Sequence, residues 1–88
     1  MIIPERFDFS HHKVFNDEVN KVFNDPGAKH LTLDFSKTTY LDSSALGMLV
    51  LVNKKAKAHS IKTVIRGARD NAREILLIAN FDQLFDIE

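Results

Sequence analysis

The sequence predicts a small α/β domain, with a mixed β-sheet of three to four strands and helices packed mainly on one face. Residues 31–35 alternate apolar and polar side chains, the period of a half-buried strand. From Ala45 the apolar spacing becomes helical, and a second β-type run follows at residues 61–65. Two strands joined through a helix form a parallel pair with a right-handed crossover. The 88 residues provide for one domain, residues 1–88.

The first third of the chain predicts short extended pieces and then a helix. Ile2 and Ile3 precede Pro4, which is tolerated at sheet edges, and a second extended piece surrounds Asp8. Ser10 is the expected N-cap of a helix over residues 11–23. The apolar residues that recur in it at helical spacing are Val14, Phe15, Val19, Val22 and Phe23. The Pro26-Gly27 pair ends it.

The central stretch, residues 31–52, organises the rest. After the strand, residues 36–39 are small and polar, and Tyr40-Leu41 briefly restores the apolar pattern. Asp42, Ser43 and Ser44 then stand where a helix to about residue 58 begins, and any of the three can cap it. One cap needs one such residue. A spare hydroxyl beside the free N–H groups of a helix start is also a good phosphate acceptor, so a modification site is the sharper hypothesis.

The last third predicts a strand over residues 61–65, a helix and an apolar ending. Gly67 ends the strand, and Asp70 or Asn71 is expected to cap the third helix. Asn80 is a reasonable residue for its C-terminal end. The closing residues predict one helical turn whose side chains cover the core, and these are Phe81, Leu84, Phe85 and Ile87.

Composition excludes several classes of function. Twelve basic and twelve acidic residues balance, and no aromatics are interleaved with the lysines of residues 54–57, so no nucleic-acid partner is expected. There is no cysteine, and the adjacent His11 and His12 would point about 100° apart on a helix, so neither a metal site nor a cofactor is expected. No apolar run approaches the roughly 20 residues of a membrane span, and the N-terminus does not look like a signal peptide. A cytoplasmic location is expected.

The segment LTLDFSKTTYL followed by DSSALG resembles the central motif of STAS domains, the fold of anti-sigma factor antagonists. In that family a strand ends in a hydrophobic residue and Asp-Ser-Ser/Thr-Gly-Leu-Gly, and a helix follows. The closing segment NAREILLIANFDQLFDI and the Arg6-Phe7-Asp8 segment are similar to other parts of the family. Two departures stand out: Ala45 replaces the usual glycine, and the usual first strand is missing or reduced.

The resemblance implies a phosphorylation-controlled binding module without enzymatic activity. Ser43 maps onto the residue that a partner serine kinase phosphorylates, and the implied partners are a kinase or anti-sigma factor of the histidine-kinase ATPase superfamily and a metal-dependent serine phosphatase. Unphosphorylated, the surface around Ser43 would bind the regulator; phosphorylation would release it. The residues expected to contact the partner, with Met48 and Leu51 as an exposed apolar anchor, are Asp42, Ser44, Gly47, Met48, Leu51 and Asp8.

Two other functions can be weighed against the switch. A constitutive accessory subunit of an ABC lipid transporter would use the same helix start to bind an ATPase without phosphorylation. A serine hydrolase built on Ser43 would need a G-x-S-x-G elbow or an equivalent base geometry, and the sequence has neither. Intact mass with and without phosphatase would separate the first alternative from the switch.

Overall fold

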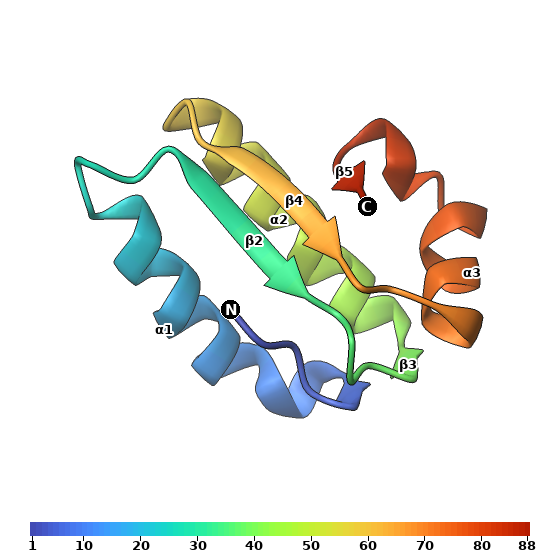
Figure 1. Ribbon diagram of the computed structural model, residues 1–88. Coiled ribbons are helices and arrows are strands. Elements are labelled where there is room, and N and C mark those ends of the chain that lie inside the picture. The colour runs from blue at the N-terminus through green and yellow to red at the C-terminus, as the bar shows by residue number, and fades with distance from the viewer.

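The computed structural model describes residues 1–88 as three α-helices, two single 3-10 turns and five strands (Figure 1). The elements follow one another as β1 (Arg6–Phe7), η1 (Phe9–His11), α1 (His12–Phe23), β2 (His30–Asp34), β3 (Tyr40–Leu41), α2 (Ser43–Ala58), β4 (Lys62–Arg66), α3 (Asp70–Ile78), η2 (Phe81–Gln83) and β5 (Asp86–Ile87). The expected β2–α2–β4 unit is therefore present.

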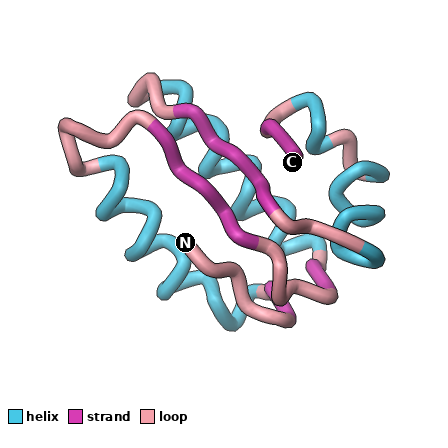
Figure 2. Tube along the Cα trace, in the orientation of Figure 1, coloured by secondary structure: helices cyan, strands magenta, loops and turns pink.

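The strands form two sheets in which every pair is parallel. β2, β4 and β5 make one sheet, with Leu33 opposite Ile65, and β1 pairs with β3 in the other. The expected extended piece at Ile2 is a single parallel bridge to Asp34. Figure 2 shows β2 and β4 side by side with helices behind them. The small α/β fold predicted from the sequence is confirmed, but the expected mixed sheet of three to four strands is corrected to five parallel strands divided between two sheets.

α1 and α2 lie behind the three-stranded sheet, and α3 lies beside it, next to β3 and η2 (Figure 1). Leu31, Leu33 and Ile65 point from β2 and β4 into a single core that also receives Phe15 from α1 and Leu76 from α3. The ends of β4, Lys62 and Arg66, are exposed, whereas its three central residues are all buried, including Val64 on the same side of the strand as the two ends. The expected core role of the closing aromatic residues holds for Phe81 and Phe85, and the core also contains Phe7, Phe15 and Phe35.

Two predicted helix caps are wrong. Ser10 does not cap α1; instead Asp8 accepts from the Ser10 backbone N–H and caps the η1 turn that leads into α1. Neither Asp70 nor Asn71 caps α3, whose N-cap is Arg69 without a side-chain hydrogen bond. The Asn71 side chain is used elsewhere, because its Nδ2 donates to the Thr39 carbonyl at 3.2 Å. In both places the short polar side chain makes a different hydrogen bond in place of the cap: Ser10 with Asp8, and Asn71 with Thr39.

The end of the chain contains one strand more than expected. Asn80 has a left-handed backbone, φ 61°, and stops α3 close to where it was predicted to end. After η2 the chain turns and β5 pairs with β4, where Ile87 lies opposite Ile65. Two residues are too few to show a strand period, so the sequence alone could not reveal β5.

Gly67 ends β4 with a positive φ of 79°, a conformation that favours glycine. It also lies against the chain that leaves β2, because a Cβ at this position would sit 3.2 Å from the backbone nitrogen of Ser36. The close approach keeps the exits of β2 and β4 in contact. No helix of the chain is long and apolar enough to cross a membrane.

Candidate functional site

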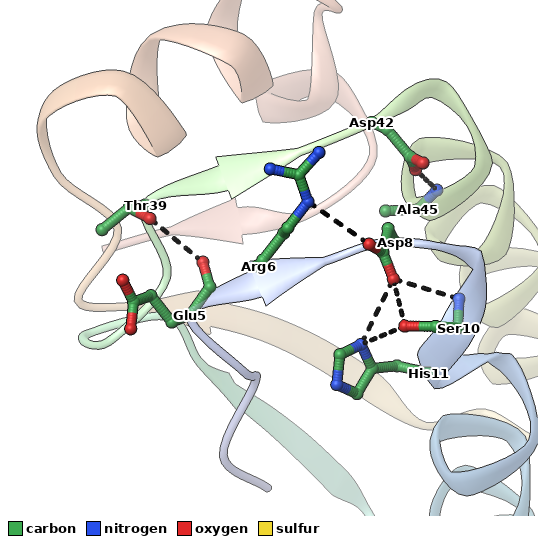
Figure 3. A network of polar contacts seen from close by, with 8 residues as sticks. All are labelled: Glu5, Arg6, Asp8, Ser10, His11, Thr39, Asp42 and Ala45. Atoms are coloured by element: carbon green, nitrogen blue, oxygen red, sulfur yellow. Dashed lines mark hydrogen bonds and ion pairs between the residues drawn. The ribbon is translucent and has the colours of Figure 1, made fainter.

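The site predicted from the sequence lies where β1 and β3 end and α2 begins. The register of the two strands pairs Phe7 with Leu41, and the Asp42 N–H donates to the Phe7 carbonyl at 3.3 Å. Asp8 and Asp42 therefore leave the paired strands as neighbours, as the close view in Figure 3 shows. The expectation that Asp8 lies near the start of α2 holds.

Asp42 is the N-cap of α2. Its backbone is extended, φ −95° and ψ −179°, and its Oδ1 accepts from the Ala45 N–H at 2.8 Å. This is the bond that a capping carboxylate makes to the first turn of a helix. Ser43 and Ser44 are both exposed, and neither hydroxyl is needed for the cap. Of the three candidate caps, only Asp42 accepts the capping hydrogen bond, and the two serines remain accessible.

An exposed stripe continues from the serines along α2. Ser44, Gly47 and Leu51 are separated by three and four residues, which puts them on one side of a helix, and all three are exposed. The Leu51 side chain is 57% exposed, which agrees with its expected role as an apolar anchor. At 1.5 Å per residue, it lies about 10 Å along the helix from Ser44. We call Ser43, Ser44, Gly47 and Leu51 the α2 stripe.

The expectation that Met48 is part of an exposed anchor is wrong. Met48 is only 6% exposed and belongs to the core. It lies three residues after Ala45 and four before Val52, and both of these residues face the sheet side of α2. The helical spacing therefore turns Met48 inward and leaves Leu51 alone outside.

Asp8 is the centre of a polar network beside this helix start (Figure 3). Its carboxylate accepts from the Ser10 hydroxyl and backbone N–H, and it lies 3.4 Å from Arg6 Nε and 3.5 Å from His11 Nδ1. The Ser10 hydroxyl, followed by the other donors, holds the pKa of Asp8 below its ordinary value. The Arg6 guanidinium also lies 4.8 Å from the centre of the Tyr40 ring.

The sequence reasoning missed Arg6, Ser10, His11 and Tyr40 as parts of this surface. A signal existed for Ser10, because an aspartate followed two residues later by a serine is typical of a local side-chain turn. The positions of Arg6 and Tyr40 depend on the pairing of β1 with β3. Strands of two residues are too short for this pairing to be predicted from the sequence.

The geometry of the site does not favour nucleophilic catalysis. Ser43 has no hydrogen bond to a histidine, and the ring of His11 contacts Ser10 and Asp8. An activated serine needs a base within hydrogen-bond reach. What the site presents is an exposed hydroxyl at the positive end of a helix of 16 residues.

Comparison with known proteins identifies the family. The family model for the STAS domain matches residues 2–88. The chain belongs to the STAS domain family. A STAS-domain containing protein of Pseudomonas aeruginosa strain UCBPP-PA14 is 40% identical over 85 residues, which are 97% of this chain and 82% of that protein.

Two solved structures have the same fold. A crystal structure from Thermotoga maritima, described as a candidate anti-sigma factor antagonist, has a TM-score of 0.77 at 22% identity and covers 98% of this chain and 75% of its own. The anti-sigma factor antagonist SpoIIAA in its unphosphorylated form has a TM-score of 0.75 at 11% identity, covering 99% and 74%. The fold of this STAS domain is thus that of anti-sigma factor antagonists.

One departure of this STAS domain from the family motif has a structural outcome. Ala45, which stands where the family usually has glycine, is completely buried at the first turn of α2. Its methyl group is part of the core, so the alanine supports the helix start and leaves the exposed side of the stripe unchanged.

Proposed function

We propose that this STAS domain is a phosphorylation-controlled protein-binding module of a partner-switching system. Unphosphorylated, it binds a serine kinase or anti-sigma-type regulator of the histidine-kinase ATPase superfamily through the α2 stripe, Asp42 and Asp8. Phosphorylation of Ser43 releases it, and a metal-dependent serine phosphatase restores binding. The observation that carries the proposal is that Ser43 is exposed at the first position of a helix already capped by Asp42.

A phosphate at Ser43 is compatible with the fold. It adds about −1.5 to −2 charges and three acceptor oxygens. Negative charge at a helix N-terminus is stabilising, and α2 has the free N–H groups of its first turn there. Because the Asp42 carboxylate already caps Ala45, the phosphate has no structural bond to replace. The switch therefore works without refolding of the domain.

The negative charge of a phosphate at Ser43 lowers the affinity for a bound partner. The Asp42 carboxylate directly precedes Ser43 and belongs to no ion pair, so a binding surface that fits the unphosphorylated site already has to accommodate a negative charge there. Adding nearly two further charges in a closed interface, unpaired or facing like charge, costs several kcal/mol. Each 1.4 kcal/mol is a factor of ten in affinity, so a loss of about a hundredfold or more is expected.

Gly47 supports a protein-binding role for the α2 stripe. A glycine within a helix is about 1 kcal/mol less favourable than alanine. Nothing of this chain lies within 4 Å of where its Cβ would be, so no internal contact requires glycine at this position. Close approach of another backbone is a reason for glycine that the isolated domain does not contain.

The test uses charge at matched positions. The partner is first identified by capture from the native cell, and its affinity for purified variants is then measured by calorimetry. Ser43→Ala should bind as wild type does, and Ser43→Asp about a hundredfold more weakly. Ser60→Asp, with the same charge at the exposed far end of α2, is the control and should bind normally. Equal affinity of Ser43→Asp and wild type would contradict the switch.

A second measurement separates the switch from constitutive binding. Intact mass of the protein from its native host should show a species about 80 Da heavier, the mass of one phosphoryl group, that phosphatase removes and that Ser43→Ala lacks. Gly47→Ala provides a further check, because it should raise the free energy of unfolding by about 1 kcal/mol and yet weaken partner binding. A stabilised variant with unchanged affinity would remove Gly47 from the interface.

A further inference from the structure

A second candidate site lies at the other end of α2. A cavity of about 300 Å³ is formed between the C-terminal half of α2, the start of β4 and the segment from η2 to β5. The lining residues come from α2 beyond its midpoint, from the start of β4 and from the last turn of the chain, and they include Asn53, Thr63 and Phe85. Asn53 is ten residues after Ser43, which is about 15 Å along the helix. The cavity is therefore separate from the α2 stripe.

Two of the three buried polar residues of the chain line this cavity, and both lack hydrogen-bond partners. The third, Thr38, donates to the Pro4 carbonyl at 3.0 Å. Thr63 is 7% exposed, and its Oγ1 is buried with no partner in the protein. Asn53 is also 7% exposed and takes part in none of the side-chain hydrogen bonds of the chain, but its amide atoms are not closed off from solvent as the Thr63 hydroxyl is. Buried polar groups are nearly always paired, so the buried, unpaired Thr63 hydroxyl, with the Asn53 amide in the lining of the same cavity, indicates a ligand.

The charges around the cavity define the chemistry of that ligand. Lys62 and Asp86 neutralise each other, with Nζ and Oδ2 2.9 Å apart, and Asp86 raises the pKa of Lys62. Lys57 and Asp82 also line the cavity and belong to no ion pair of the chain. One free ammonium, one free carboxylate, an amide and a hydroxyl thus surround the same space.

We propose that this cavity binds a small zwitterion of the free α-amino acid class. The ligand carboxylate would lie toward Lys57 and its ammonium toward Asp82, while Asn53 and Thr63 would supply the hydrogen bonds that orient it. Leu84 and Phe85 offer an apolar wall for a side chain. A volume of about 300 Å³ is ten times the share of one water molecule and lies at the lower limit of ligand pockets.

The experiment measures the melting temperature and the ¹H–¹⁵N spectrum of the full chain with each of the twenty L-amino acids at 10 mM. At a concentration ten times Kd, a ligand of the native state should raise the melting temperature by about 5 °C or more. The amide signals that move should come from residues around 53, 63 and 83. If none of the twenty raises the melting temperature or moves these signals, the proposal is overturned.

Three threonine and asparagine variants test the site itself. Thr63→Val and Asn53→Leu remove unpaired polar groups, so the free protein should melt at the same or a higher temperature, and the response to the amino acid should disappear. Thr38→Val is the matched control: it removes a paired buried hydroxyl, should lower the melting temperature, and should retain the response. An amino-acid response in Thr63→Val equal to that of wild type would contradict the site. Ser43→Asp should leave the response unchanged, so this test is independent of the phosphorylation switch.

Discussion

The two helices that follow the ends of β3 and β4 begin in different ways. At α2, Asp42 has the extended backbone of an N-cap and its carboxylate bonds to Ala45, so the start of the helix is complete without its serines. At α3, Arg69 provides no side-chain cap, and Asp70 has a left-handed φ of 52°. The polar residue after it, Asn71, bonds to the Thr39 carbonyl.

The difference separates a helix start with unused hydroxyls from one whose polar side chains form internal bonds. The polar groups of α3 are used to connect the helix to the loop before β3, which leads directly into the candidate site. The polar groups of α2 are more numerous than its cap requires, and the surplus faces solvent. A helix start with unused hydroxyls is open to modification, whereas one whose side chains form internal bonds is not.

The largest effect is expected for the α2 cap. Asp42→Ala should lower the free energy of unfolding by about 1–2 kcal/mol, because the Ala45 N–H loses its partner. Chemical denaturation with a constant m-value would measure it. Asp42→Asn, which keeps a capping oxygen, is the control and should lose much less. An unchanged stability in Asp42→Ala would mean that Ser43 can take over the cap.

At α3 a cap can be added. Arg69 has an extended backbone, φ −149°, and Arg69→Ser should raise the free energy of unfolding by about 1 kcal/mol. The same denaturation experiment applies, with Arg69→Ala as the control for loss of the arginine itself. Serine and alanine variants of equal stability would show that the left-handed Asp70 prevents capping here.

The bond from α3 to the loop should matter less. Asn71→Ala removes an exposed hydrogen bond to Thr39 and should cost about 0.5–1 kcal/mol. Partner affinity should fall slightly at the same time, since the loop leads to β3 and Asp42. Measuring both quantities on Asn71→Ala and Asn71→Asp would show whether the two ends of the loop are coupled.

The serines of α2 should have the smallest effect on stability. Ser43→Ala and Ser44→Ala should each change the free energy of unfolding by less than about 0.5 kcal/mol, because neither hydroxyl has a structural partner. A loss as large as that of Asp42→Ala would contradict the division of roles between the aspartate and the serines.

The Asp8 network gives a prediction about pH. Because the pKa of Asp8 is lowered in the folded chain, its contribution to stability is present above the ordinary value of 3.8 and is lost as the pH falls through the folded pKa. Carboxyl NMR should show its midpoint below 3.8, and Ser10→Ala should move it upward, since the Ser10 hydroxyl is the main cause. The same midpoint in both proteins would exclude that cause.

Local pattern was enough to predict the central unit of the fold. The alternation at residues 31–35, the helical spacing after Ala45 and the apolar run at 61–65 correspond to β2, α2 and β4, and α2 ends at Ala58 as expected. Ser43 was predicted to be accessible, and the structure places it on the surface. These features depend on side chains that act within one element.

What the sequence could not predict depends on contacts between elements. β5 forms only because two residues pair with the edge of β4. Met48 is buried because the side of α2 that carries it faces the sheet. Asn71 was expected to cap its own helix, yet Thr39, distant in sequence, was the better partner. A period or a capping preference contains no information about such neighbours.

Gly67 connects the candidate site to a part of the chain outside the α2 stripe. The side chain of any larger residue at position 67 would contact Ser36 and move apart the chain segments that follow β2 and β4. The segment that begins at Ser36 continues through β3 to Asp42 and Ser43. In a random mutagenesis screen for loss of partner binding, position 67 should therefore appear among the sensitive sites. Such variants would report a displaced β3–α2 connection, since residue 67 lies outside the proposed binding residues.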